Sequence, residues 1–138
     1  MDTIFALDAN VIIHYLRENE NVTKNFDNAV VEGSKLLIPR AVDYEIRRGL
    51  ELLNATKKTA IYNDMVGING QCLVTDMGED IWTIAKDIYV KLHRQSLTVG
   101  EIDILIAAFC LRHGFTLVTA NTKDFVNIPE IQLENWWK

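Results

Sequence analysis

Four apolar residues, Ile4 to Leu7, run directly into Asp8, and a second apolar segment begins at Val11. An uninterrupted apolar run of this length predicts a strand that is buried on both faces, as in a parallel sheet. The apolar residues that follow Asn10 recur at helical spacing, so a helix is expected after almost no loop. The segment therefore predicts a buried strand that carries the Asp8 carboxylate to the end of a sheet.

The same alternation of short apolar runs and helical patterns continues along the chain. Further strands are predicted at residues 36–38, 72–75 and 115–118, with a short edge strand near 131–133. Helices are predicted at residues 11–16, 22–30, 42–54, 57–66, 76–92 and 99–113. Strands that alternate with helices predict an α/β fold, in which helices cover both faces of a central parallel sheet.

Composition narrows the class of protein. A chain of 138 residues is expected to form a single domain, residues 1–138. The net charge of −5 argues against a protein that coats nucleic acid, but not against a nuclease whose own site is acidic. The two cysteines lie in apolar stretches and are expected to be free thiols. With an acidic N-terminus and no long apolar run, the chain is expected to be cytoplasmic, without membrane association.

Four acidic residues are expected at the carboxyl edge of the sheet. Asp8 ends the first predicted strand, and Glu45 lies in the opening turns of the helix that follows the second. The helix that has Asp103 near its start leads into the fourth strand and runs antiparallel to it, so its N-terminus lies at the same edge. Asp124 follows the fourth strand. Because open parallel sheets bind ligands at the carboxyl ends of their strands, these acids predict a site there.

Each of these acids also has an ordinary structural interpretation. Asp8 and Asn10 are both favoured residues at a helix N-cap, and Glu45 fits an exposed helix position. Asp103 would complement a helix dipole, and Asp124 suits a turn. The order of the strands does not follow from spacing. The sequence therefore predicts a shared edge for the four acids but not contact among them. A combined interpretation has Asn10 serving the helix and Asp8 serving the site.

Four carboxylates at one edge favour a metal site. Closely packed carboxylates raise one another's pKa unless a cation is present. Oxygen ligands without histidine or cysteine favour hard ions such as Mg²⁺ or Mn²⁺. The histidines at positions 14, 93 and 113 lack metal-ligand spacing and are assigned structural or surface roles. Covalent catalysis is not indicated, since no serine or cysteine is paired with a histidine at this edge.

Other acids near the predicted helix starts are assigned structural roles. Thr98 and Glu101 have capping-box spacing at the start of the last long helix. Asp76 and Glu79 have the same spacing at the start of the preceding helix. Asp43 is interpreted as an ordinary acid in the first turn of its helix. Whether Glu101 or Asp43 assists the metal site is left open by the sequence.

Four blocks of sequence carry a family resemblance. They are LDANVII around Asp8, IPRAVDYEIRRGL around Glu45, EIDILIAAFCLRHGFTLVTANTKDF around Asp103 and Asp124, and a closing LENWW. On these blocks, essentially the whole chain resembles the PIN-domain ribonucleases, and within them the VapC-type toxins of bacterial and archaeal toxin–antitoxin pairs. The third block is long and specific, whereas the first alone carries little weight.

The resemblance implies that Asp8, Glu45, Asp103 and Asp124 form the acidic metal site. It also implies supporting polar roles for Asn10, Thr119 and Asn121. The implied protein has a parallel sheet of about five strands and forms a homodimer. It would be an endoribonuclease that depends on Mg²⁺ or Mn²⁺ and is inhibited by a partner antitoxin. The family's small hydroxyl residue shortly before the glutamate is not evident here, where residues 40–43 read RAVD.

An acidic site that cuts RNA needs basic residues beside it to attract phosphates. Five cations lie on or near the predicted helix that carries Glu45 and are candidates for phosphate contacts. They are Arg40, Arg47, Arg48, Lys57 and Lys58. A solvated helix face explains these cations equally well.

Other classes of protein fit parts of the pattern. One is a PIN-fold nuclease that processes RNA without an antitoxin, and another is a catalytically idle PIN-fold binding module. Intact acids at all four positions argue against the idle module. A haloacid-type phosphatase would need a second aspartate where the chain has Asn10. A receiver-like domain would need paired acids near the first strand and a lysine after a late strand, for which Lys123 is a weak match.

Overall fold

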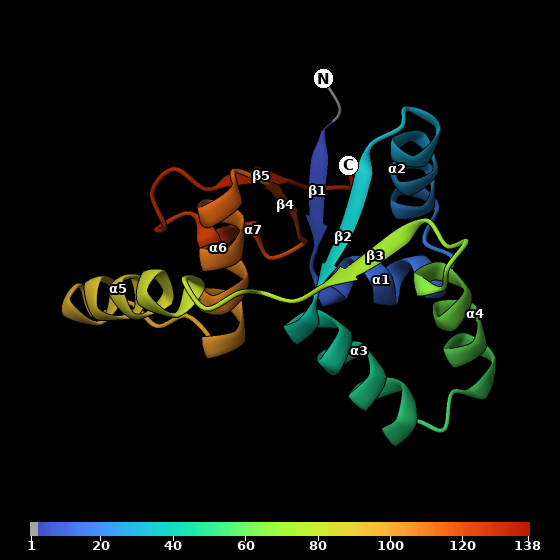
Figure 1. Ribbon diagram of the computed structural model, residues 1–138, viewed down its shortest axis with the longest axis horizontal. Helices are drawn as coiled ribbons and strands as arrows, with labels where there is room; N and C mark the ends of the chain where they lie inside the picture. The colour runs from blue at the N-terminus through green and yellow to red at the C-terminus, as the bar shows by residue number, and fades with distance from the viewer. Residues whose placement is uncertain (1–2) are drawn as a thin grey trace.

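The computed structural model describes residues 3–138, and Figure 1 shows how their strands and helices are arranged. The described strands are β1 (Ile4–Leu7), β2 (Lys35–Pro39), β3 (Cys72–Thr75), β4 (Thr116–Val118) and β5 (Gln132–Glu134). The described helices are α1 (Ala9–Leu16), α2 (Glu20–Val31), α3 (Arg40–Leu52), α4 (Thr56–Val66), α5 (Ile81–Arg94), α6 (Glu101–His113) and α7 (Thr122–Phe125). The predicted strands agree with these bounds to within one residue at each end.

The five strands form one parallel sheet in the order β3-β2-β1-β4-β5. The chain first builds outward from β1 through β2 to β3. It then crosses back over the sheet and adds β4 on the other side of β1. The order of the strands therefore reverses between β1 and β4, and a crevice for ligands is expected at the carboxyl ends of those two strands.

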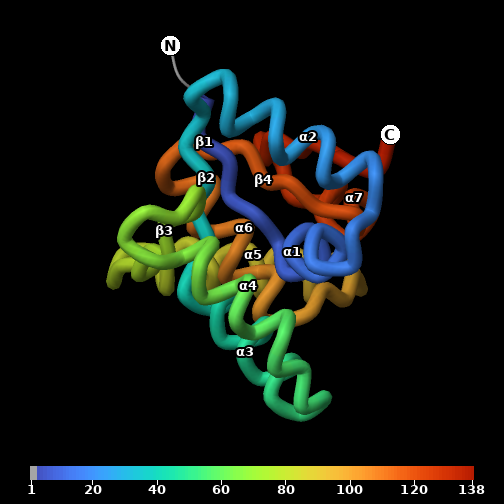
Figure 2. The backbone as a smooth tube through the Cα atoms, turned by 90° about the vertical axis from the view of Figure 1, so that its right-hand side faces the viewer, coloured from blue at the N-terminus to red at the C-terminus, as the bar shows by residue number. Residues whose placement is uncertain are grey.

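Helices cover both faces of the sheet, which confirms the predicted α/β class. Figures 1 and 2 together place α1, α2 and α4 on one face and α5 and α6 on the other. Helix α3 begins directly after β2 and extends away from the carboxyl edge of the sheet (Figure 1). The two sets of helices arise because right-handed crossovers in opposite directions along a sheet fall on opposite faces.

The core lies where the central strands meet the helices on either side. Central residues of β1, β2 and β4 are fully enclosed, among them Leu7, Ile38 and Leu117, each 0% exposed. Helix α6 is apolar on almost every side because the sheet and α5 enclose it, and it ends at Gly114 with a left-handed φ of 73°. Near the C-terminus, Trp136 packs edge-on against Phe5. A large apolar area removed from water is the main source of stability for this arrangement.

Two predicted capping boxes are wrong. Helix α6 begins at Glu101 with Gly100 in the N-cap position, so Thr98 makes no cap and Glu101 is simply exposed. Helix α5 begins at Ile81, beyond the predicted pair at positions 76 and 79. Both segments have capping-box spacing, but neither helix has a side-chain hydrogen bond at its N-cap. In the described part of the chain, no helix is both long and apolar enough to cross a membrane.

Candidate active site

Asp8 lies at the point where the strand order reverses. It directly follows β1, and its backbone N–H donates to the carbonyl of Val118 at the end of β4 at 3.0 Å. The register continues from Leu7 opposite Val118 to Asp8 beside Thr119. Thr119 Oγ1 donates to Asp8 Oδ2 at 2.8 Å, and both side chains are buried. The parallel pairing of β1 with β4 thus fixes this carboxylate at the centre of the carboxyl edge.

From the sequence, Asn10 was expected to serve the helix and Asp8 the site, but Asp8 is the residue that caps the helix. Asp8 occupies the N-cap position of α1, and its Oδ1 accepts from the backbone N–H of Ala9 at 2.8 Å. Asn10 does not cap the helix. Its Oδ1 accepts from the backbone N–H of Ala120 at 3.2 Å, and its Nδ2 lies 3.4 Å from both Asp8 Oδ2 and Thr119 Oγ1. Asn10 therefore links the start of α1 to the segment after β4.

The segment after β4 is held by the Thr119 hydroxyl. Its Oγ1 accepts from the backbone N–H of Asn121 at 3.1 Å while it donates to the Asp8 carboxylate. The Asn121 side chain is exposed and occupies the N-cap position of the short helix α7. Thr119 thus orients both Asp8 and the turn that leads to Asp124, whereas Asn121 contributes to that turn through its backbone.

The other three predicted acids come from three separate helices near this edge. Glu45 lies in the second turn of α3 and Asp103 in the first turn of α6, and both are partly buried. Asp124 lies in α7 and is exposed. Burial raises the pKa of Asp103 to about 6, and the negative charges of the other three acids add to that rise. A carboxylate that feels three others in this way shares one region of space with them.

The pKa values of Asp8 and Glu45 are also raised. Burial raises the pKa of Asp8, although hydrogen bonds from Thr119 and its helix neighbours oppose the rise. Burial also raises the pKa of Glu45, the charge of Asp8 raises it further, and the positive charge of Arg48 opposes both. Three acids of the site therefore ionise less readily than free carboxyl groups. A bound cation would reverse that effect, because it favours the charged form of each.

The acids influence one another, but they do not form a ready-made set of metal ligands. Within residues 3–138, no three acidic, histidine or cysteine side chains are grouped closely enough to hold a metal ion. The donor set itself fits a hard divalent cation, since it offers only oxygen ligands that need positive charge nearby. His14, His93 and His113 instead pack against aromatic rings.

A buried acid, Asp43, lies two residues before Glu45 on α3, a spacing that puts the two side chains on different faces of the helix. Asp43 is only 6% exposed. Its Oδ1 accepts hydrogen bonds from the Tyr62 hydroxyl of α4 at 2.7 Å and from Arg47 Nε at 3.0 Å. Arg40 Nη1 lies 3.8 Å from Oδ2 of the same carboxylate. Asp43 does lie in the first turn of α3, as predicted, but its burial and its contact with α4 were not predicted.

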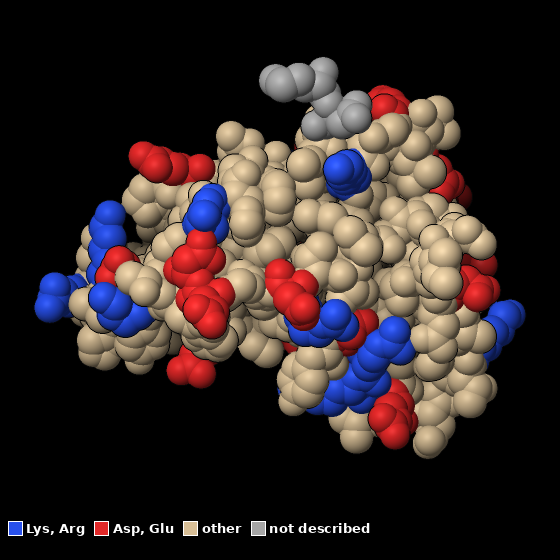
Figure 3. Space-filling view, in the orientation of Figure 1, with Lys and Arg blue, Asp and Glu red and all other residues tan. Residues whose placement is uncertain are grey.

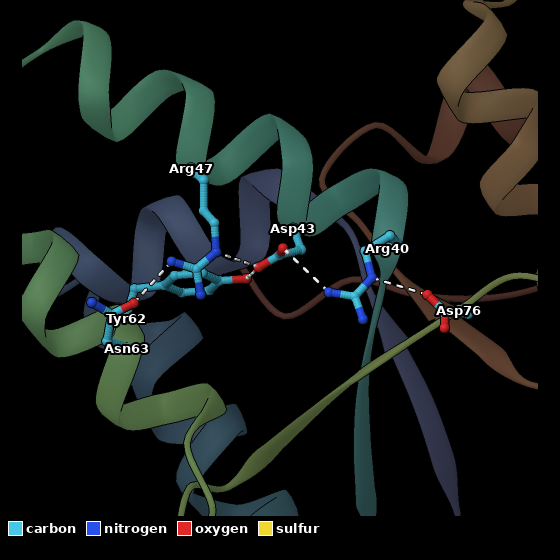
Figure 4. Close-up of polar contacts among 6 residues, drawn as sticks. All are labelled: Arg40, Asp43, Arg47, Tyr62, Asn63 and Asp76. Atoms are coloured by element: carbon cyan, nitrogen blue, oxygen red, sulfur yellow. Dashed lines mark hydrogen bonds and ion pairs between the residues drawn. The ribbon is translucent and has the colours of Figure 1, made fainter.

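The two arginines extend these contacts to neighbouring segments. Arg47 Nη1 donates to Asn63 Oδ1 at 2.9 Å, and its guanidinium lies 5.0 Å from the centre of the Tyr62 ring. Arg40 Nε lies 3.1 Å from Asp76 Oδ1 in the loop after β3. Asp76 thus pairs with an arginine and does not cap α5. We call the group that Figure 4 labels the Asp43 cluster: Arg40, Asp43, Arg47, Tyr62, Asn63 and Asp76.

Part of the Asp43 cluster carried a signal in the sequence. Arg40 and Arg47 stand three residues before and four residues after Asp43, the spacing at which side chains meet on one helix face. The hydroxyl of Tyr62 had no such signal, because its contact depends on how α4 packs against α3.

Replacing Asp43 by alanine is expected to lower the free energy of unfolding by about 2 kcal/mol. The change leaves the buried Tyr62 hydroxyl without its acceptor and removes the shared counter-charge of two partly exposed arginines. Tyr62→Phe, which removes only the donor, should cost about 1 kcal/mol. Asp76→Ala is the matched control, because its side chain is 85% exposed and an ion pair there contributes little. Urea unfolding that gives Asp43→Ala and Asp76→Ala the same stability would contradict the role of Asp43 in joining α3 to α4.

The structure separates the five predicted RNA-binding cations into two kinds. Arg40 and Arg47 belong to the Asp43 cluster and balance a buried charge. Among the described residues, Arg48, Lys57 and Lys58 make no ion pair; Arg48 and Lys57 are exposed, and Lys58 is partly buried. Figure 3 shows lysine and arginine side chains gathered over the region of α3 and α4, with a separate group over α5. Cations therefore gather over α3 and α4, and α3 is the helix that begins at the acidic edge.

Comparison with known proteins finds similarity along nearly the whole chain. The chain is 24% identical over 135 residues to a ribonuclease VapC2 from Rickettsia felis, across 98% of this chain and 99% of that protein. It is 26% identical over 133 residues to a tRNA(fMet)-specific endonuclease VapC from Salmonella typhimurium, across 96% and 97%. It also superposes with a TM-score of 0.84, at 25% identity and 99% coverage of both chains, on a chain in the crystal structure of DNA-bound VapBC from Salmonella typhimurium.

The PIN domain family matches residues 5–131, a span that begins inside β1 and includes every predicted acid of the site. The relatives match along nearly their whole length, so the likeness is one of complete folds and not of a shared motif. The chain belongs to the PIN domain family.

Proposed function

We propose that this chain is a metal-dependent endoribonuclease of the VapC type, the toxin of a toxin–antitoxin pair. The observation that carries the proposal is the mutual effect of the four acids at the point where the strand order reverses. Asp8, Glu45 and Asp124 all raise the pKa of Asp103, which supports a shared acidic site at this edge. Similarity to VapC ribonucleases over the whole chain supports RNA as the substrate.

The residues of the chain divide the work of such a site. Asp8 is the rigid member, since Thr119 Oγ1 and the backbone N–H of Ala9 fix both of its oxygens. Glu45 and Asp103 approach from α3 and α6, and Asp124 approaches from the exposed helix α7. The four acids would hold Mg²⁺ or Mn²⁺. When bound, the cation would polarise the phosphate and lower the pKa of a water molecule for hydrolysis of the phosphodiester bond.

Positive charge must bring the RNA backbone to this acidic edge. Arg48, Lys57 and Lys58 are the cations on the α3 side that are free of ion pairs within residues 3–138. They are the proposed phosphate contacts, and a salt-dependent affinity is expected from them. Arg40 and Arg47 retain exposed guanidinium surface, with 56% and 44% of their side chains accessible, so they are secondary candidates.

An antitoxin and a second copy of the chain are the proposed protein partners. The support for the antitoxin is the close superposition on a chain of a VapBC structure from Salmonella typhimurium. The support for the homodimer is the family resemblance alone. A chain of this kind would arrest growth when expressed alone, and the product of a neighbouring small gene would relieve the arrest.

The test of the proposal is RNA cleavage by the purified chain. The expected result is cleavage of single-stranded RNA with Mg²⁺ or Mn²⁺ and complete loss of cleavage in EDTA, restored by an excess of either ion. Activity that persists unchanged in EDTA would overturn the metal mechanism. Cleavage without growth arrest would indicate a nuclease that works without an antitoxin. No cleavage with either ion would leave a PIN fold that serves as a binding module.

A further inference from the structure

Two arginines of α3 each lie over a tyrosine ring, and the two rings differ in exposure. In one pair, Arg47 lies over Tyr62, which is 0% exposed and belongs to the Asp43 cluster. In the other pair, Arg48 lies over Tyr44, whose side chain is 56% exposed, with the guanidinium 4.9 Å from the ring centre. The first pair holds α3 to α4. The second pair holds no helix in place, so packing does not explain it.

The exposed pair is also close to the acidic site. Arg48 follows Glu45 by three residues on α3, the spacing at which side chains are neighbours on a helix surface. On a helix, residues 44 and 48 lie on the same face, next to the face of residue 45 and away from that of Asp43. The pair therefore lies beside Glu45 on α3, in the region over which lysine and arginine side chains gather (Figure 3).

We propose that Tyr44 and Arg48 form a stacking subsite for a base of single-stranded RNA next to the scissile phosphate. This inference rests on the proposed ribonuclease function. Arg48 covers one face of the Tyr44 ring, and the high exposure of the ring leaves surface for a base to stack against. Within residues 3–138, Arg48 gives one hydrogen bond, from Nη1 to the Tyr44 hydroxyl at 3.4 Å, and pairs with no carboxylate.

The remaining donors of Arg48 explain why the ligand is a nucleotide. A guanidinium has five N–H donors, so most of those on Arg48 are free to contact a phosphate. An aromatic face beside a phosphate-binding cation matches the two parts of a nucleotide, its base and its backbone. Every base has a π-face, so stacking tolerates different sequences. The subsite would position the strand and raise affinity without choosing a particular base.

The test measures binding and cleavage separately. Binding of fluorescein-labelled single-stranded RNA is measured by anisotropy in an Asp103→Asn background, which prevents cleavage during the measurement. Tyr44→Ala is expected to weaken binding roughly tenfold. Tyr44→Phe keeps the ring and should bind like the parent. In the active protein, Tyr44→Ala should raise KM in proportion and leave kcat nearly unchanged. Tyr89→Ala is the matched control, because Tyr89 is an exposed tyrosine on the distant helix α5 that stacks on His93.

A set of RNAs, each lacking the base at one position, tests stacking directly. The parent protein should lose affinity for one or two of these RNAs, and Tyr44→Ala should no longer distinguish them from intact RNA. Equal loss with every RNA, or no loss for Tyr44→Ala, would overturn the subsite. Intact RNA binding combined with a change in oligomeric state or in antitoxin binding would also overturn it and assign Tyr44 to a protein contact. If the wild type cleaves no RNA at all, the proposed function fails first, so the two failures are distinguishable.

Discussion

Replacing Asp103 by asparagine is expected to abolish RNA cleavage and to raise the melting temperature of the metal-free protein. Activity is expected to fall and stability to rise, because the charge that the proposed site needs is unfavourable in the folded, metal-free protein. Asparagine keeps the size of the side chain but removes the negative charge. Loss of one essential charged group at a site of this kind typically costs roughly a hundredfold or more in rate. The cleavage assay with Mn²⁺ measures the first effect and thermal unfolding in EDTA measures the second.

The stability gain follows from the sign of the pKa shift. The pKa of Asp103 rises from 3.8 to about 6 in the folded protein. The folded state therefore binds a proton more readily than the unfolded state, and stability falls as the pH rises from about 4 to about 6. At neutral pH the wild type carries this penalty in full, and asparagine does not. After allowance for partial solvent exposure, the gain is about 1 kcal/mol, or roughly 3–5 °C in Tm.

The sign of the stability change also separates two interpretations of Asp103. An acid that only complemented the helix dipole would stabilise α6, so its loss would lower the Tm. Glu101→Gln is the matched control, because Glu101 is an exposed acid in the same first turn. It should keep full activity and should not gain stability. A lower Tm for Asp103→Asn, or cleavage at the wild-type rate, would remove Asp103 from the proposed site.

Binding of Mg²⁺ or Mn²⁺ is expected to stabilise the wild type more strongly at pH 7 than at pH 5. Metal ligands must be deprotonated, so protons compete with the ion. A carboxyl with a pKa of about 6 is largely protonated at pH 5 and largely charged at pH 7. From that group alone, the apparent affinity should rise about tenfold between these two values. The raised pKa of Asp8 and of Glu45 adds to the change in the same direction.

The measurement is the rise in Tm during a Mn²⁺ titration at each pH. Because a ligand that binds only the folded state stabilises it by an amount set by its concentration and Kd, the two titrations give the two affinities. Asp103→Asn should show weak stabilisation and little dependence on pH. Equal stabilisation of the wild type at both values, or more at pH 5, would contradict an acidic metal site whose members repel one another when empty.

Local sequence determined most of the fold and the direction in which each predicted acid lies. The apolar run of residues 4–7 and its counterparts marked the strands to within a residue. Chain direction alone brought Asp8, Glu45, Asp103 and Asp124 to the carboxyl edge, since a helix that follows a strand begins at the edge where the strand ends. Both results depend only on near neighbours in the chain, so periodicity and connectivity are enough to predict them.

Helix starts and side-chain partners were predicted less well. Capping spacing placed two helix starts incorrectly, and Asn10 was expected to serve the helix that Asp8 in fact caps. In each case the local pattern fits more than one structure. The side chain of Asn10 reaches the backbone of Ala120, a residue far along the chain, and that contact competes with the local one. A tertiary contact of this kind cannot be predicted from the spacing of residues along the chain.

The packing of elements decided what lies beside Asp8. The order of the strands puts β4 next to β1, and this pairing alone brings Thr119 within 2.8 Å of the Asp8 carboxylate. The docking of α4 on α3 turns Asp43 from an ordinary helix acid into a buried hydrogen-bond acceptor for Tyr62. By itself, the sequence determined which acids reach the edge, because that follows from chain direction. Only the tertiary structure decided which side chains orient and balance them, because those contacts join segments distant in sequence.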